Sequence, residues 1–157
     1  MKILLAIDGS PYSDAAVAEV CRRPWPDQSE VRLITVDAPI DPSLLQGGAK
    51  DAFSEMIKQL RTEAIRRLHA AAAVFKNSAP ELHVTPVLRE GWPKNVILDE
   101  AEQWGADLIV VGSHGYGAVK RLFLGSVSLA IATNARCSVE IVRVSTTASS
   151  QAEPATI

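Results

Sequence analysis

The sequence is short of the residues that mark several protein classes. It has two cysteines among 157 residues, Cys21 and Cys137, which form neither a CxxC pair nor a cluster with histidine. We therefore expect no disulfide framework and no cysteine-bound metal. Both thiols are interpreted as small buried side chains in a reduced, cytoplasmic protein.

Charge of one sign and long apolar runs are also lacking. Sixteen basic and eighteen acidic side chains leave a net charge of −2, whereas nucleic-acid binders usually carry a basic excess. The apolar run of residues 3–7 is broken by Asp8, so it is shorter than the core of a signal peptide. No later run reaches membrane-spanning length. We expect neither a nucleic-acid nor a membrane partner.

What the sequence does contain is a regular alternation of strand and helix patterns. Alternation of this kind favours parallel strands with helices on both faces of one sheet. Residues 1–144 are predicted to form one domain, and the Ser/Thr/Ala-rich residues 145–157 a disordered tail. The expected strands are Lys2–Asp8, Glu30–Val36, Leu82–Leu88, Asp107–Val111 and Val139–Val144, and the expected helices are Pro11–Arg22, Asp51–Lys76, a segment from Pro93 to Gly105, and Ser126–Asn134.

Local signals support these assignments. Ser10 is a suitable N-cap before Pro11 at the first helical position, and Gly105 is a suitable C-cap. The long second helix carries one apolar stripe at three-four spacing, which predicts a single buried face. Its members are Phe53, Met56, Ile57, Leu60, Ala64, Leu68, Ala71, Ala72 and Phe75. The three tryptophans, Trp25, Trp92 and Trp104, are interpreted as packing residues.

Glycine is concentrated after the fourth strand, in the stretch Gly112–Gly125. Ligands of open α/β sheets bind beyond the carboxyl ends of the strands. Glycine lets main-chain N–H groups approach a ligand closely, and successive N–H groups form anion-binding concavities. The helix that opens at Gly125-Ser126 adds the positive end of its dipole. The stretch therefore indicates a polyphosphate held between a loop and a helix start.

Two common nucleotide motifs do not fit. A Walker A loop requires Gly-Lys-Ser/Thr after its second glycine, and this stretch has none. A dinucleotide-binding fingerprint requires a third glycine at the position of Lys120. Such a fingerprint also follows the first strand of the fold, whereas this stretch follows the fourth.

The spacing that does fit is Gly112, Gly115 and then Gly125-Ser126, together with an apolar first strand that ends in Asp8. In these features the chain resembles the ATP-binding class of the universal stress protein family, over nearly its whole length. The resemblance implies a Rossmann-like fold of the adenine-nucleotide alpha hydrolase type. Its open five-stranded parallel sheet would have the order 3-2-1-4-5, so that the first and fourth strands flank a crevice.

The same resemblance implies how ATP, with Mg²⁺, would lie. Gly112, His114 and Gly115 would lie against the phosphates and ribose, and Gly125, Ser126 and Val127 would supply donors to the phosphates. Asp8 would lie near the ribose hydroxyls or a bound Mg²⁺. Ala6 and Ile7 would line the adenine side, with main-chain atoms of Val36 facing the base.

Several alternatives stay open at this stage. Asp8 could be simple turn chemistry, Ser126 could only cap its helix, and Lys120 and Arg121 could be either phosphate-balancing or solvated. The resemblance also implies a homodimer paired through the fifth strand. Glu140 interrupts the apolar run of that strand, and charges at a sheet edge discourage such pairing. The leading hypothesis is a nucleotide-dependent regulator in the stress response, with little or no hydrolysis and no catalytic residues. The alternatives are a slow ATPase or adenylate-forming enzyme, and a dimeric interaction protein that needs no nucleotide.

Overall fold

The computed structural model describes residues 1–40, 50–115 and 124–144. Within them the chain alternates strands and helices, as the sequence predicts, and the ends differ from the predicted ones by at most a residue or two. The elements are β1 (Lys2–Ala6), α1 (Pro11–Arg22), β2 (Glu30–Asp37), α2 (Lys50–Ser78), β3 (His83–Glu90), α3 (Pro93–Trp104), β4 (Leu108–Gly112), α4 (Ser126–Asn134) and β5 (Ser138–Val142).

The five strands form one parallel sheet in the order β3-β2-β1-β4-β5, which confirms the order that the family resemblance implied. β1 lies in the centre, and its last residue, Ala6, pairs with Ile34 of β2 and Val111 of β4. The carboxyl ends of β2, β1 and β4 therefore lie side by side at one edge of the sheet.

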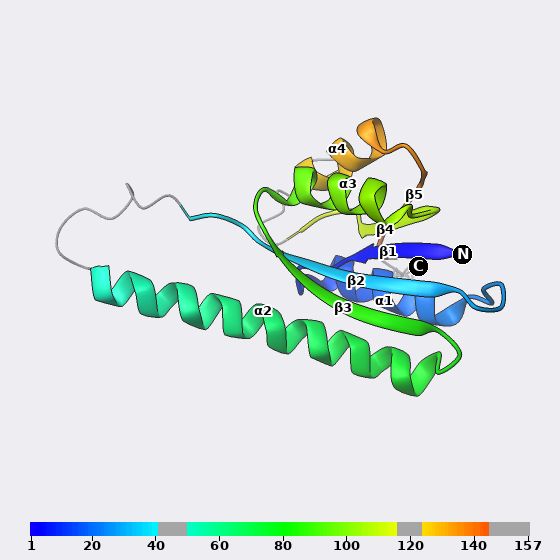
Figure 1. The fold of residues 1–157 in the computed structure, drawn as a ribbon, viewed down its shortest axis with the longest axis horizontal. Coiled ribbons are helices and arrows are strands. Elements are labelled where there is room, and N and C mark those ends of the chain that lie inside the picture. The colour runs from blue at the N-terminus through cyan, green and yellow to red at the C-terminus, as the bar shows by residue number, and fades with distance from the viewer. Residues whose placement is uncertain (41–49, 116–123, 145–157) are drawn as a thin grey trace, which may run out of the picture.

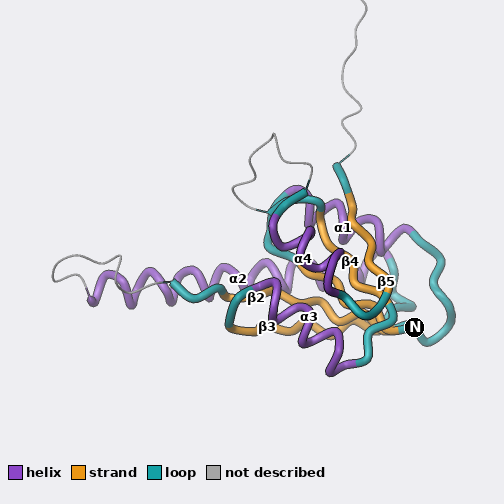
Figure 2. Tube along the Cα trace, turned by 90° about the horizontal axis from the view of Figure 1, so that it is seen from above, coloured by secondary structure: helices purple, strands orange, loops and turns teal. Residues whose placement is uncertain are grey.

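Two helices cover each face of the sheet (Figures 1 and 2). α1 and α2 pack on one face over a core that includes Ile3, Leu5, Leu33 and Val110, all fully buried. α3 and α4 pack on the other face over Leu4, Ile34 and Ile109 among others. Because β1 and β4 are buried on both faces, they read in the sequence as nearly continuous apolar runs.

The predicted helix caps are confirmed. The Ser10 side chain accepts a hydrogen bond from the Ser13 amide and caps α1, with Pro11 in the first turn. Gly105 ends α3 in the left-handed conformation, at φ 68°. Among the described residues, none of the helices combines the length and the apolar character needed to cross a bilayer.

The apolar stripe of α2 is buried along only part of its length. Leu68 and Phe75 are buried against the sheet, but Met56, Ile57 and Leu60 are 37–48% exposed. The reason is geometric: α2 has 29 residues, and its first half extends beyond the sheet (Figure 1). The prediction of one continuous buried face is therefore wrong for the first three turns.

The tryptophans and cysteines also differ in part from expectation. Trp25 and Trp104 pack against the two cores, but Trp92 is 63% exposed at the start of α3, so its assignment as a packing residue is wrong. Cys21 and Cys137 are free thiols, half-buried and not fully buried. Burial raises the pKa of both.

An ion cluster fixes α3 on the sheet. Glu100 of α3 is buried and accepts hydrogen bonds from Arg32 of β2 and Arg89 of β3 at 2.6 and 2.8 Å. Burial alone would raise the pKa of Glu100, but the two guanidinium groups outweigh it and hold that pKa below its ordinary value. The Arg32 guanidinium also lies over the Trp104 ring, 4.3 Å from its centroid. The cluster therefore fixes the position of α3, including its first turn, relative to β2 and β3.

Candidate functional site

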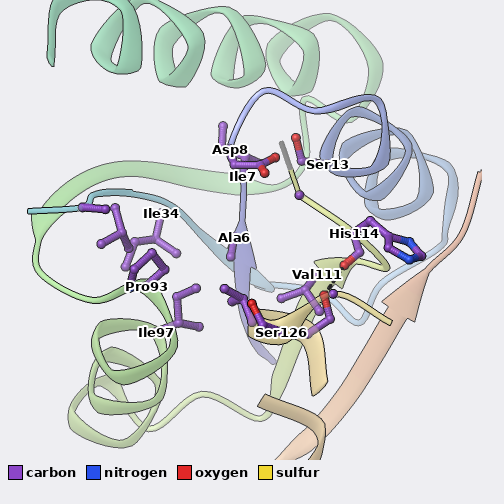
Figure 3. A pocket seen from close by; sticks show the side chains of 17 residues that line it. Ala6, Ile7, Asp8, Ser13, Ile34, Pro93, Ile97, Val111, His114 and Ser126 are labelled. Atoms are coloured by element: carbon purple, nitrogen blue, oxygen red, sulfur yellow. Dashed lines mark hydrogen bonds between the residues drawn. The ribbon is translucent and has the colours of Figure 1, made fainter. Parts of the chain in front are cut away.

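A pocket of about 530 Å³ opens at the carboxyl ends of β1, β2 and β4 (Figure 3). Its volume lies within the range of small-molecule sites, roughly 300–1,000 Å³. It brings together every residue that the sequence assigned to nucleotide binding, drawn from β1, β2, β4, α4 and their connections. Those residues are Ala6, Ile7, Asp8, Val36, Gly112, His114, Gly115, Gly125, Ser126 and Val127.

The two sides of the pocket differ in chemistry. Ile34 and the first turns of α3, with Pro93 and Ile97, form an apolar wall, while Asp8 and Ser13 lie across from it (Figure 3). Ala6 at the end of β1 forms the floor between them. A ligand that fits must therefore have a flat or apolar part at one end and polar groups at the other.

Hydrogen bonds to the start of α1 hold the turn after β1. Asp8 Oδ1 accepts from the Ser10 amide at 2.9 Å, and the Gly9 amide donates to Ser13 Oγ at 3.1 Å. Gly9 turns the chain at φ 81°, a conformation that favours glycine. The second carboxylate oxygen, Oδ2, faces Gly115 across the crevice. Turn chemistry and a role in the site are therefore compatible for Asp8.

Two glycines of the pocket make close approaches that an added Cβ would crowd. A Cβ on Gly115 would lie 2.7 Å from Asp8 Oδ2, so any other residue there would push the acid from its place. A Cβ on Gly112 would lie 2.7 Å from the main-chain carbon of Tyr12. The absence of a Gly112 side chain thus serves the packing of α1 on β4 as well as the pocket.

The start of α4 faces the pocket with its main chain. Gly125 is the N-cap, and its amide donates to the Ser113 carbonyl at 2.8 Å. Ser126 is the first helical residue, so the alternative that Ser126 caps the helix is wrong. The amides of Ser126 and Val127 belong to the first turn, which has no acceptors within its helix. They supply the donors and the partial positive charge that suit an anion.

His114 lines the pocket chiefly through its main chain. Its ring lies beside the Tyr12 ring, at a centroid distance of 5.0 Å, with Nδ1 3.2 Å from Ser113 Oγ. In Figure 3 the ring points away from Ala6 and Asp8. His114 therefore lines the pocket, as the prediction requires, while its imidazole packs beside Tyr12; its contact with a ligand stays a prediction.

Sequence reasoning missed part of the lining. The sequence of α3 contains no binding motif. Pro93 indicates only the start of a helix and Ile97 only a buried helical position, so neither predicts a pocket wall. Lys120 and Arg121, for which phosphate balancing stayed an open alternative, lie outside the described residues. The missed lining residues are Ser13, Ile34, Ala38, Pro93, Ile97, Val111 and Ser128.

Comparison with protein families now adds to this geometry. Residues 1–143 match the model of the universal stress protein family. The chain belongs to the universal stress protein family. Universal stress protein YxiE of Bacillus subtilis is 32% identical over 149 residues, which cover 90% of this chain and 98% of the relative.

Solved structures agree on the fold. Hypothetical protein MJ0577 superposes with a TM-score of 0.80 at 24% identity, covering 92% of this chain and 96% of that one. A universal stress protein family protein from Arabidopsis thaliana, solved with AMP bound, has a TM-score of 0.63 at 17% identity, covering 92% of each chain. At these identities the comparison establishes the Rossmann-like α/β architecture of the family.

Proposed function

We propose that this universal stress protein binds ATP in the crevice between β1 and β4 and acts as a nucleotide-dependent regulator in the stress response. The observation that carries the proposal is the meeting of Asp8, Gly115 and the first turn of α4 around one pocket. The adenine would lie against Ala6 and the apolar wall, near the main chain of Val36. The phosphates would lie toward Gly115 and the Ser126 and Val127 amides.

Mg²⁺ fits this arrangement as part of the nucleotide complex. Mg²⁺ is usually held by one or two carboxylates together with substrate phosphates, and seldom by an all-protein cage. Among the described residues no cluster of three or more histidine, cysteine or acidic side chains offers a cage. Asp8 would be the protein ligand, and the metal would neutralise phosphate charge.

We expect little hydrolysis. Among the described residues that line the pocket, the acidic and imidazole side chains are those of Asp8 and His114, and the His114 ring is turned away (Figure 3). Regulation would instead follow from binding, which shifts a conformational equilibrium only if ATP distinguishes the two states. A slow ATPase remains the second candidate, and phosphate release separates the two.

The regulator would work in the cytoplasm as a homodimer paired through β5. Glu140 does not oppose such pairing, because its carboxylate accepts two hydrogen bonds of 2.7 Å from Arg23 at the end of α1. Its charge is therefore directed at the α1 face and away from the sheet edge. Ile141→Lys would introduce a charge at this strand, and we expect it to halve the mass measured by light scattering.

Thermal unfolding with nucleotides tests the proposal. ATP at a hundred times its dissociation constant adds about 2.7 kcal/mol of stability, which raises the melting temperature by several degrees for a chain of this size. ATP, ADP and AMP should be compared with and without Mg²⁺, alongside phosphate release. No shift with any of them supports an interaction protein that needs no nucleotide, and a shift with steady phosphate release supports an ATPase.

A further inference from the structure

The side chain of Arg67 links α2 to the candidate site. Its Nη1 donates to the main-chain carbonyl of Asp8 at 3.2 Å, a contact between residues 59 positions apart. Its aliphatic stem lies across Gly9, where an added Cβ would be 2.6 Å from Arg67 Cδ. Figure 3 shows α2 passing over the turn that carries Asp8.

Arg67 is itself held in place. Its Nε donates to Glu63 Oε1 at 3.0 Å, one turn earlier on α2. Its side chain is 35% exposed, so about two-thirds of it is covered by the protein. The glycine at position 9 is therefore needed twice, for its positive φ and for the passage of the arginine stem.

The contacts of Asp8 divide between α1, α2 and the pocket. One carboxylate oxygen is bonded to the Ser10 amide, the carbonyl to Arg67, and the second carboxylate oxygen faces Gly115. A rotation of the Asp8–Gly9 peptide would shift the Ser10 amide that holds the first carboxylate oxygen, and the carboxylate would then be free to turn out of the crevice. The arginine opposes such a rotation because its guanidinium bonds the carbonyl of the same peptide.

We propose that Arg67 is a positioning residue that orients the Asp8 carboxylate toward the ribose hydroxyls of the bound nucleotide. This inference rests on the proposed function. It assigns to α2 a part in nucleotide selectivity, through discrimination between a ribose and a sugar that lacks its hydroxyls. A site built to bond hydroxyl groups rejects analogues that lack them, because its polar groups are then left unpaired.

The test compares three variants by titration calorimetry with ATP, 2′,3′-dideoxy-ATP, AMP and adenosine. Arg67→Met removes the donor and keeps the stem. Arg67→Lys keeps a charge and a donor. Arg66→Met is the matched control, because Arg66 is the neighbouring arginine and also pairs with Glu63, but its hydrogen bonds go to Glu63 and not to Asp8. Circular dichroism checks that each variant is folded.

We expect Arg67→Met to weaken ATP binding about ten-fold, the scale of one charge-assisted hydrogen bond. Its preference for ATP over the dideoxy analogue should fall toward one, the loss should be the same for ATP, AMP and adenosine, and Arg67→Lys should recover part of the preference. Arg66→Met should match wild type.

Other results overturn the inference. A loss that grows with the number of phosphates, with sugar preference unchanged, would make Arg67 a direct phosphate contact. Equal losses of affinity in Arg66→Met and Arg67→Met would mean that Arg67 acts only through the positive charge of α2 and not through its hydrogen bond to Asp8. If wild type binds none of the four compounds, the proposed function itself falls, and with it this inference.

Discussion

Replacing Gly115 by alanine tests the closest contact in the candidate site. The added methyl group would lie 2.7 Å from Asp8 Oδ2, whereas non-bonded atoms of this size prefer a separation of roughly 3.5 Å. The carboxylate must therefore retreat by roughly 0.8 Å. Gly115 does not have a positive φ in the structure, so alanine is compatible with its backbone and the fold should survive.

The expected consequence is a loss of nucleotide affinity with little loss of stability. Moving a side chain off its preferred rotamer costs roughly 1 kcal/mol, which is small for a domain of this size. A carboxylate displaced from the sugar should weaken ATP binding about ten-fold, or about 1.4 kcal/mol. At a fixed saturating ATP concentration, the ligand-induced stabilisation falls by the same amount.

The assay is calorimetric titration with Mg-ATP within a double-mutant cycle. Asp8→Ala removes the oxygen that the methyl group would strike, so Gly115→Ala should have no further effect in that background. An equal loss in both backgrounds would show that the methyl group acts on the ligand directly. Unchanged affinity in the single variant would refute the reasoning from this contact altogether.

Three further predictions concern the frame around the pocket. Glu100→Gln should lower the free energy of unfolding by about 3 kcal/mol at pH 7, because it leaves two arginines without a buried anion. Since the pKa of Glu100 is depressed in the folded state, this contribution is present above the ordinary carboxyl pKa and is lost as the pH falls. Urea titrations should therefore show the gap to wild type closing below pH of about 4, and a gap that persists there would contradict the ion-cluster account. Gly112→Ala, whose Cβ would meet the Tyr12 backbone, should destabilise the protein by about 1–3 kcal/mol with or without ATP, and a stability equal to wild type would show that α1 can shift freely. Ser128→Ala removes the 2.7 Å hydrogen bond to the buried Gly112 carbonyl and should cost about 1–3 kcal/mol in the same assay, whereas no change would mean that the carbonyl finds another donor.

Local chemistry made much of the fold predictable from the sequence. Ser10-Pro11 and Gly105 mark helix ends because their conformations are set by the residues themselves. The buried strands read as apolar runs because both faces are covered. The strand order, however, was predicted from the resemblance to a family. Alternation of strands and helices indicates that the strands are parallel, but it does not determine their order in the sheet.

Features that depend on tertiary arrangement could not be read from the sequence in the same way. The α2 stripe is periodic throughout, yet where the sheet ends decides that Ile57 is exposed and Leu68 is buried. Trp92 is apolar in type but stands at the exposed start of α3. In the sequence Arg67 is one of several charged residues on a long helix, and the passage of α2 over Gly9 brings it to Asp8.

The most direct measurement of the central claim is a crystal structure with Mg-ATP at saturating concentration. The account predicts density for the base between Ala6 and Pro93, and for the phosphates beside Gly115 and the first turn of α4. An empty crevice under those conditions, or a nucleotide seated elsewhere on the protein, would contradict it.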